Sequence, residues 1–261
     1  MGFASTAIIL CAGSGSRMGS SENINKCAIP FGGTTSVRHV ARALLEAGAK
    51  HIAAVVGYAK DSVCSALAGI GASVGYVPNE DYDFHGCNYS VACGVLHESV
   101  LHSERVLIAE GDSLLHMDNV REIVTFRGDA AALVRQGEYV DYSKSVMAIG
   151  YHTNAGITRF AYNTDHSNAP PEMAEGEAII GESMQLWSFS GSPLQELRSL
   201  LREYKHMADL SSTPMMESGV YSINMLTSPI TPVRARKPDG WINMNTPEDL
   251  RKAGSAEWLL G

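Results

Sequence analysis

A glycine-rich segment and two cations stand near the start of the chain. The segment reads L-C-A-G-S-G-S-R-M-G at positions 10–19, follows a short apolar run at 6–10, and precedes Lys26. The backbone N–H groups of a glycine-rich turn after a strand can wrap phosphate groups. Two cations beside such a turn, here Arg17 and Lys26, would neutralise a polyanion. These residues predict a phosphate-binding loop; the alternative is a structural turn with two solvated cations.

Three kinds of nucleotide loop compete for this segment. A dinucleotide-binding fingerprint needs G-x-G-x-x-G, but Met18 stands at the third glycine. The fingerprint also needs an acidic residue after the next strand, where this chain has Gly57-Tyr58-Ala59-Lys60. A P-loop needs G-K followed by Ser or Thr, which the segment lacks. The third kind is a nucleoside-triphosphate loop in which Arg17 and Lys26 contact the phosphates.

The loop and the segment around Lys26 together resemble the signature of the nucleotidyltransferases called pyrophosphorylases. Their pattern is L-x-A-G-x-G-x-R-M followed by P-K or N-K and a Pro-Gly turn, and this chain has L-C-A-G-S-G-S-R-M-G and then N-K-C-A-I-P-F-G-G. These enzymes join a nucleoside monophosphate to a phosphorylated acceptor and release pyrophosphate. The resemblance implies that the loop and Arg17 hold the triphosphate and that Lys26 bridges the α-phosphate and the acceptor.

Further segments extend the resemblance to nearly the whole chain. The sequence G-C-N-Y-S-V-A-C-G at 86–94 is similar to the S-V-x-x-G helix start of cytidylyltransferases, where the serine meets the nucleoside. In the isoprenoid branch an arginine precedes that serine by three residues, and here Cys87 holds its place. The nucleotide-binding residues that the resemblance implies are Leu10, Cys11, Ala12, Gly13, Ser14, Gly15, Ser16, Asn88, Ser90, Glu110 and Gly111.

Two other segments resemble the family's metal site. V-L-I-A-E-G-D at 106–112 looks like a strand that ends in G-D, whose Asp holds Mg²⁺, and Asp112 matches it. W-I-N-M-N-T-P-E-D-L at 241–250 resembles W-x-D/E-I/V-D-T-P-E-D-L, but both acidic positions are amides, Asn243 and Asn245. The resemblance implies Mg²⁺ (or Mn²⁺) on Asp112 and Asn245. Since an amide oxygen adds no charge, Glu110, Glu182 or substrate oxygens would compensate, or the protein is catalytically impaired.

In its overall length, its N-Y-S segment and its aromatic second half, the chain looks most like the phosphocholine and phosphonate cytidylyltransferases. A choline-type cation requires aromatic faces and a carboxylate, whereas a phosphate or phosphonate requires cations. Hydrophobic packing is the alternative for every aromatic residue. The acceptor-binding residues that the resemblance implies are Arg135, Lys144, Glu182, Trp187, Glu217 and Trp241, with Tyr139, Tyr142, Tyr151 and Tyr221 as further aromatic candidates.

Alternating strands and helices must position these residues in the first half of the chain. Short apolar runs at 6–10, 52–56, 73–77 and 105–109 predict strands. Helical spacing predicts helices at 37–45, 60–68, 88–101 and 117–126, with Asp118 as the N-cap of the last. This alternation is typical of a parallel sheet covered on both faces.

The second half has a different pattern. Strands are predicted at 130–134, 145–151, 157–162, 183–189 and 233–236, with a hairpin turn at 154–156 and a polar excursion at 163–181. Helices are predicted at 193–207 and 214–226, and Thr246-Pro247 opens a last helix. We expect one α/β domain, 1–261, with a Rossmann-like mixed, mainly parallel sheet flanked by helices. Residues 1–128 would form the nucleotide half and 129–261 the acceptor half, and the resemblance implies the nucleotide-diphospho-sugar transferase type.

Composition excludes several classes of protein. The 261 residues are 45% hydrophobic and 18% charged, which excludes a disordered chain. A net charge of −8 does not favour binding to nucleic acid or to an anionic membrane surface. No apolar stretch is long enough to span a bilayer. The five cysteines form no CxxC pair, and the first residues lack a basic n-region. We therefore expect free thiols and a cytoplasmic protein, with a homodimer left open.

These observations lead to one expected function and two alternatives. We expect a magnesium-dependent nucleotidyltransferase that moves CMP from CTP onto a small phosphorylated or phosphonate acceptor and releases pyrophosphate. Its partners would be the triphosphate and the acceptor. The alternatives are a sugar-1-phosphate nucleotidyltransferase that uses another base, and a non-catalytic nucleotide-binding protein, which the amides Asn243 and Asn245 motivate.

Overall fold

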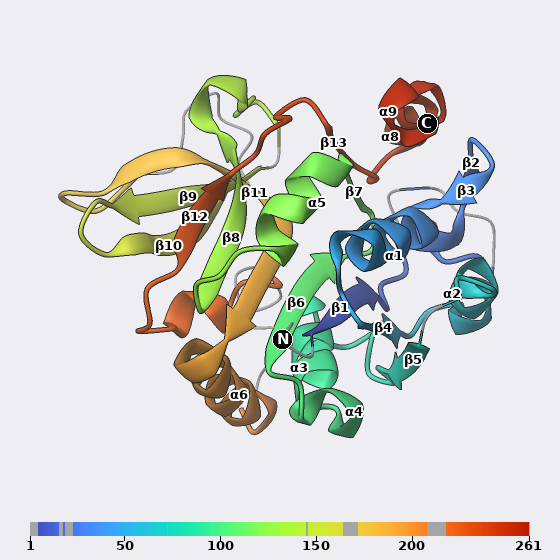
Figure 1. The fold of residues 1–261 in the computed structure, drawn as a ribbon, viewed down its shortest axis with the longest axis horizontal. Helices are drawn as coiled ribbons and strands as arrows, with labels where there is room; N and C mark the ends of the chain where they lie inside the picture. Colours follow the sequence, from blue (N-terminus) through green and yellow to red (C-terminus); the bar gives the residue numbers. More distant parts are fainter. Residues whose placement is uncertain are drawn as a thin grey trace.

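Strands from both halves of the chain join one sheet. The computed structural model describes residues 5–15, 18, 23–71, 73–144, 146–163, 172–207 and 218–260. Within these residues the sheet has nine strands, with the path β10-β9-β11-β6-β1-β4-β5 (Figure 1). Beside this path, β8 pairs with β11, and β12 pairs with β8.

The N-terminal half supplies the parallel strands. β1 (Ser5–Cys11) lies between β4 (His51–Val56) and β6 (Arg105–Glu110), and β5 (Ser73–Pro78) lies outside β4. The third, second, first and fourth strands of this half are therefore neighbours in that order, which is the order of a Rossmann-like sheet. Every residue of β1 is buried, because both faces of the sheet are covered.

The C-terminal half adds mostly antiparallel strands beyond β6. β11 (Ala178–Ser190) pairs antiparallel with β6, with β8 (Ala130–Gln136) and with β9 (Val146–His152). β10 (Gly156–Asn163) pairs with β9, and β12 (Thr231–Arg234) runs parallel to β8. The α/β fold with a mixed, mainly parallel sheet flanked by helices is confirmed.

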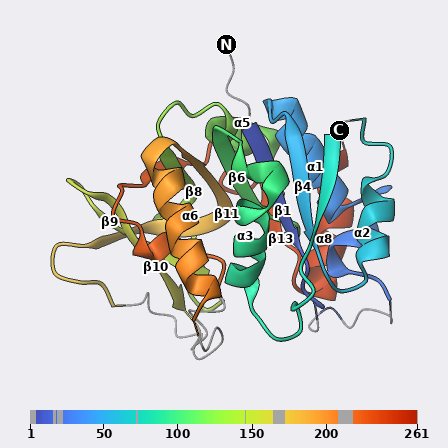
Figure 2. The same cartoon turned by 90° about the horizontal axis from the view of Figure 1, so that it is seen from below.

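Helices cover both faces of the sheet (Figure 2). Alternate residues of β1 point to opposite faces, so Ile8 and Leu10 join one core and Ala7 and Ile9 the other. No helix of the described ranges is long and apolar enough to cross a membrane. The helices over the Ile8 core are α3 (Cys87–Leu96), α4 (Glu98–Leu101) and α6 (Gly191–Lys205), and those over the Ile9 core are α1 (Ser36–Ala47), α2 (Lys60–Leu67) and α5 (Met117–Val124).

A short sheet brings the C-terminal region to the carboxyl end of β6. β7 (Ser113–Leu115) follows β6 almost directly and pairs antiparallel with β13 (Trp241–Asn243). The backbone N–H of Met244 then donates to the Asp112 carbonyl at 2.9 Å. The region ends in α8 (Pro247–Ser255), which begins at the predicted Thr246 cap with a complete capping box, and α9 (Glu257–Leu260). A second short sheet pairs β2 (Pro30–Phe31) with β3 (Thr34–Thr35).

Two predicted helices are built differently. The helix expected at 88–101 is interrupted at His97, whose backbone is extended and whose Nδ1 accepts from the Ser99 N–H to begin α4. The N-cap of α5 is His116 rather than the predicted Asp118. Nδ1 of His116 accepts the backbone N–H of Asp118, which lies in the first turn. At the start of each helix a histidine ring nitrogen therefore accepts the capping hydrogen bond, which a side chain of Ser, Thr, Asp or Asn usually accepts.

Two predictions in the second half are corrected over the residues that the structure describes. The polar excursion expected to continue to 181 ends earlier, because β11 begins at Ala178. In the helix expected at 214–226, residues 218–222 form turns and Ile223–Met225 a 3-10 helix, while 208–217 lie outside the described residues. The hairpin turn at 154–156 is confirmed, with Gly156 at φ +76° beside the Ile230 carbonyl.

Candidate active site

A cleft of about 550 Å³ opens at the carboxyl ends of β1 and β6. The strand order reverses between these two strands, and open α/β sheets bind ligands at such a position. The glycine-rich loop, the start of α3, part of β11 and the segment around β13 line the cleft. The predicted site residues that line it are Leu10, Ala12, Gly13, Ser14, Gly15, Lys26, Ser90, Glu110, Asp112, Trp241 and Asn245.

The two glycines of the loop differ in what they require. Gly15 has φ +65°, and a Cβ at this position would lie 2.8 Å from the Lys26 Cβ. A side chain at Gly15 is therefore excluded by both backbone conformation and space. A Cβ at Gly13 would have no atom within 4 Å, so this residue faces open space in the cleft. Ser16 and Arg17 of the same loop lie outside the described residues.

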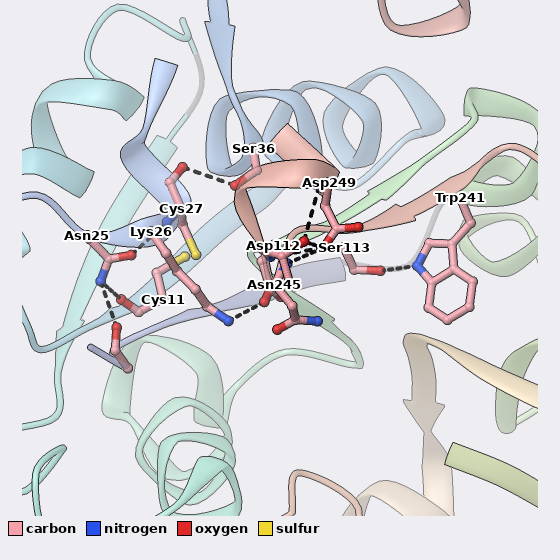
Figure 3. Close-up of polar contacts among 12 residues, drawn as sticks. Cys11, Asn25, Lys26, Cys27, Ser36, Asp112, Ser113, Trp241, Asn245 and Asp249 are labelled. Atoms are coloured by element: carbon pink, nitrogen blue, oxygen red, sulfur yellow. Dashed lines mark hydrogen bonds and ion pairs between the residues drawn. The ribbon is translucent and has the colours of Figure 1, made fainter. Parts of the chain in front are cut away.

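Asn25, which was not among the predicted site residues, holds the glycine-rich loop in place through hydrogen bonds. Its buried Nδ2 donates to the carbonyls of Cys11 at 2.8 Å, Gly13 at 3.2 Å and Tyr58 at 3.0 Å. Its Oδ1 accepts the backbone N–H of Cys27 at 2.9 Å (Figure 3). One side chain thus fixes both the exit of β1 and the start of the 3-10 helix that carries Lys26. The only sequence signal was its place next to Lys26 in the N-K pair.

Lys26 and Asp112 form an ion pair inside the cleft. Nζ of Lys26 donates to Oδ2 of Asp112, and the side chains are 20% and 5% exposed (Figure 3). Burial opposes the lysine charge, but the charge of Asp112 and its hydrogen bond outweigh burial and raise the pKa of Lys26 above its ordinary value. Lys26 is therefore a fixed cation at neutral pH, directly beside the loop glycines.

Asp112 and Asn245 lie together although they are far apart in the sequence. Asn245 follows β13, and its side chain lies beside Asp112 and the Lys26 ammonium (Figure 3). Its backbone N–H donates to the Asp249 carboxylate at 3.1 Å, which ties it to the capping box of α8. Carboxylate and amide oxygens are the ligand types that Mg²⁺ prefers. The described residues contain no group of three or more His, Cys, Asp or Glu side chains that could hold a metal.

The predicted nucleoside end of the cleft is built on α3. Ser90 lines the cleft and accepts from Asn79 Nδ2 at 3.0 Å, and Cys87 lines it as well. Burial and the nearby Glu110 raise the pKa of Cys87 well above its ordinary value, so this thiol is neutral. Asn88, predicted to bind nucleotide, is instead fully buried and bonds the hydroxyl and the backbone N–H of Ser222.

Cys11 and Gly111 lie behind the cleft wall rather than on it. Cys11 is 2% exposed, and a Cβ on Gly111 would collide with its sulfur. A hydrogen bond with Cys27, together with burial, raises the pKa of Cys11 well above its ordinary value. Both residues therefore pack the base of the loop. All five cysteines of the chain are free thiols.

The predicted acceptor-binding residues are dispersed. Arg135 forms an ion pair with the buried Glu182 at 3.2 Å and lies 5.9 Å from the centre of the Trp241 ring. Burial outweighs the arginine charge and raises the pKa of Glu182. Trp241 lines the cleft and donates from Nε1 to Ser113 Oγ at 2.8 Å. Arg135, Glu182 and Trp241 therefore lie close together, but of the three only Trp241 lines the cleft.

The remaining predicted acceptor residues also do not line the cleft, or are not described. Trp187 is 1% exposed and packs edge-on against Phe160 in the core. Lys144 is exposed and pairs with Asp141 at 3.0 Å. Glu217 lies outside the described residues. Ser183 and Gln185 of β11, which were not predicted to bind the acceptor, line the cleft.

One family model matches most of the chain. The family model described as "MobA-like NTP transferase domain" matches residues 7–214. None of the curated proteins matches the chain. The matched range includes the loop, Lys26, Ser90, Asp112 and the bulged part of β11, but not the segment around β13.

Solved structures with the same fold include two CTP transferases. The inositol-1-phosphate CTP transferase of T. maritima is 18% identical, with a TM-score of 0.67 over 94% of this chain and 90% of the other. The CTP:phosphocholine cytidylyltransferase of Streptococcus pneumoniae is 14% identical, with a TM-score of 0.65 over 96% and 97%. A Bacillus anthracis protein assigned as a glucose-1-phosphate thymidylyltransferase is 17% identical, with a TM-score of 0.66 over 97% and 94%. At these identities the likeness establishes a shared fold.

Proposed function

The chain belongs to the MobA-like NTP transferase family, and we propose that it transfers CMP from CTP to a small phosphorylated or phosphonate acceptor and releases pyrophosphate. The observation that supports this most strongly is the Lys26–Asp112 ion pair between the loop and Asn245. It sets one fixed cation and one carboxylate in the cleft at the strand ends where ligands bind in such sheets. CTP is the proposed donor because two structural neighbours are CTP transferases.

The reaction needs positioning and charge neutralisation rather than a general base. An ionised oxygen of the acceptor attacks the α-phosphorus of CTP, a new P–O bond forms, and the bond from the α-phosphorus to the α,β-bridging oxygen breaks. Pyrophosphate leaves with that bridging oxygen. Lys26 neutralises charge on the α-phosphate and the acceptor as they meet, which requires both to be held in line. The loop around Gly13 and Gly15 supplies backbone N–H groups to the triphosphate.

Magnesium is part of this proposal. Asp112 and Asn245 offer adjacent oxygen donors, and their chemistry fits Mg²⁺ (or Mn²⁺) with phosphate oxygens and water in the other positions. We assign Asp112 as the principal ligand and Asn245 as the second. When bound, the ion would neutralise negative charge on the triphosphate and on the pyrophosphate leaving group. With one carboxylate at this pair, the protein alone should bind the ion weakly and bind it together with CTP more tightly.

The test is pyrophosphate release across a matrix of triphosphates and acceptors. CTP, UTP, GTP, ATP and dTTP are each combined with Mg²⁺ and a small alkyl phosphate, an alkyl phosphonate, a polyol phosphate or a sugar 1-phosphate. Release with CTP and a small acceptor is the expected result. Release only with another base and a sugar 1-phosphate would assign the alternative transferase. CTP binding by calorimetry with no release from any combination would mean a nucleotide-binding protein.

A matched pair of variants ties the activity to the cleft. Asp112→Asn removes the carboxylate and should reduce turnover strongly. Glu104→Gln removes an exposed carboxylate just before β6, at the other end of that strand, and should leave turnover unchanged. Equal effects of the two variants would contradict the assignment of Asp112.

A further inference from the structure

Building on the proposed function, we propose that the acceptor is a small phosphate or phosphonate whose head group carries N–H or O–H donors, bound by the amide oxygens of Gln185 and Asn243. A quaternary ammonium head group has no such donors and is excluded. Buried Oε1 of Gln185 and Oδ1 of Asn243 have no hydrogen-bond partner, and both residues line the cleft. Neither residue stands among those that the sequence predicted to bind the acceptor.

A break in β11 places Gln185 in the cleft. The pairing of β11 with β8 shifts register between Ser183 and Trp187, and Gln185 has φ +60°, a left-handed conformation rare for a residue with a side chain. The backbone N–H of Gln185 donates to Ser183 Oγ at 3.2 Å, which holds the bend. Bulges of this kind re-aim side chains near active sites. A strained backbone and a buried amide oxygen without a partner at one residue together point to a ligand contact.

Asn243 is held next to the same bend. Ser113 Oγ donates to the Met184 carbonyl, one residue before Gln185, at 3.1 Å. Ser113 is also the register partner of Asn243 in the β7–β13 pair. Ser113 therefore links the segment that carries Gln185 to the strand that carries Asn243. Asn245, two residues further on, lies at Asp112, which leaves Asn243 available for the acceptor rather than for the metal site.

The chemistry of the two oxygens selects the head group. A buried carbonyl oxygen without a donor is unfavourable, and a donor supplied by a ligand removes that cost. A primary ammonium or a hydroxyl offers such donors, whereas a trimethylammonium offers methyl groups. Sites built to hydrogen-bond a substrate reject analogues that lack the group, because the buried polar atoms stay unpaired.

The aromatic residues of the cleft lead to the same conclusion. A quaternary ammonium is recognised by several ring faces around one position. Of the six aromatic residues that the sequence suggested for it, Trp241 alone lines the cleft as described, and the Arg135 guanidinium lies over its ring. The other lining tyrosines, Tyr82 and Tyr162, come from separate elements, one before α3 and one on β10. Segments 164–171 and 208–217 contain no Phe, Tyr or Trp.

Two matched pairs of acceptors test the inference. Phosphoethanolamine and phosphocholine differ only in three methyl groups on nitrogen, and glycerol 3-phosphate and propyl phosphate differ only in hydroxyls. Initial rates of pyrophosphate release with CTP and Mg²⁺ give kcat/KM for each. We expect the donor-bearing member of at least one pair to be favoured by roughly 10- to 100-fold, as expected for one or two unpaired buried oxygens. The pair that responds shows whether the donor is N–H or O–H.

Variants connect the preference to Gln185. Gln185→Met keeps the length of the side chain and removes the amide, so the preference should fall roughly tenfold through the KM of the acceptor, with the KM of CTP unchanged. Gln136→Met is the matched control, because Gln136 on β8 also has a buried unpartnered Oε1 but does not line the cleft. This control should keep the preference of the unmodified protein.

The outcomes separate the inference from the function on which it rests. Equal use of the two members of both pairs, or a higher kcat/KM with phosphocholine than with any donor-bearing acceptor, overturns the inference and leaves the transferase proposal standing. A Gln185→Met protein that keeps its preference, or that changes only the KM of CTP, overturns the role of Gln185. No release with any acceptor overturns the proposed function itself.

Discussion

Removing the ammonium of Lys26 is the most informative perturbation of the site. In Lys26→Met the buried Asp112 carboxylate, 5% exposed, loses its ion-pair partner. Breaking one side of a buried pair costs about 3–5 kcal/mol, and the 20% exposure of Lys26 places the expected loss near the lower limit, about 3 kcal/mol. Urea unfolding at neutral pH measures this loss. Lys50→Met, at an exposed lysine before β4, is the control and should lose little stability.

Measurements of kcat and CTP binding separate the catalytic role of Lys26 from its contribution to stability. If Lys26 neutralises charge that develops as the acceptor meets the α-phosphate, Lys26→Met should lower kcat by roughly 10²–10³-fold, and CTP binding should weaken less. Adding Asp112→Asn removes the unpaired carboxylate, so the double variant should regain most of the lost stability. It should not regain activity. A single variant with near-normal kcat would refute the catalytic role, and one with unchanged stability would refute the buried pair.

Three further predictions concern the loop and the metal. Gly15→Val should abolish CTP binding in calorimetry while circular dichroism stays native, since φ +65° and the contact with Lys26 leave no space; unchanged binding would make the loop a plain turn. Asn25→Ala leaves buried carbonyls without their donor and should cost about 2–3 kcal/mol in urea unfolding and weaken CTP binding; an unaffected protein would contradict the fastening role. Asn245→Asp should tighten Mg²⁺ binding and raise turnover at limiting Mg²⁺. If instead turnover falls and the KM of the acceptor rises, the added carboxylate repels an anionic acceptor.

The parallel half of the fold was predictable from short apolar runs. Strand β1 is buried on both faces, so its residues are apolar without alternation, and the glycine loop marks its end. Lys26 and Asp112 were predicted from the motifs that resemble the family. The parallel arrangement of β1 and β6, which the alternation of strands and helices predicts, brings the loop after β1 and Asp112 after β6 to one edge of the sheet.

Other parts of the site depend on long-range geometry that local sequence does not encode. Gln185 enters the cleft because β11 shifts register against β8, and a strand pattern read by itself places it as an ordinary position. Asn25 acts on carbonyls of segments distant in the sequence, so its role becomes visible only in three dimensions. Trp187 was predicted to bind the acceptor but lies in the core. An aromatic side chain suits both a cation site and a hydrophobic core, and only the tertiary packing decides between them.

The most direct test of nucleotidyl transfer is ³¹P NMR of the purified protein with CTP, Mg²⁺ and phosphoethanolamine or glycerol 3-phosphate. Transfer predicts that the CTP resonances decay while free pyrophosphate and a product with two coupled phosphorus nuclei grow in equal amounts. The coupled pair reports the new P–O–P link between CMP and the acceptor. Unchanged CTP, or the formation of CMP or CDP without the coupled pair, would contradict the proposed function.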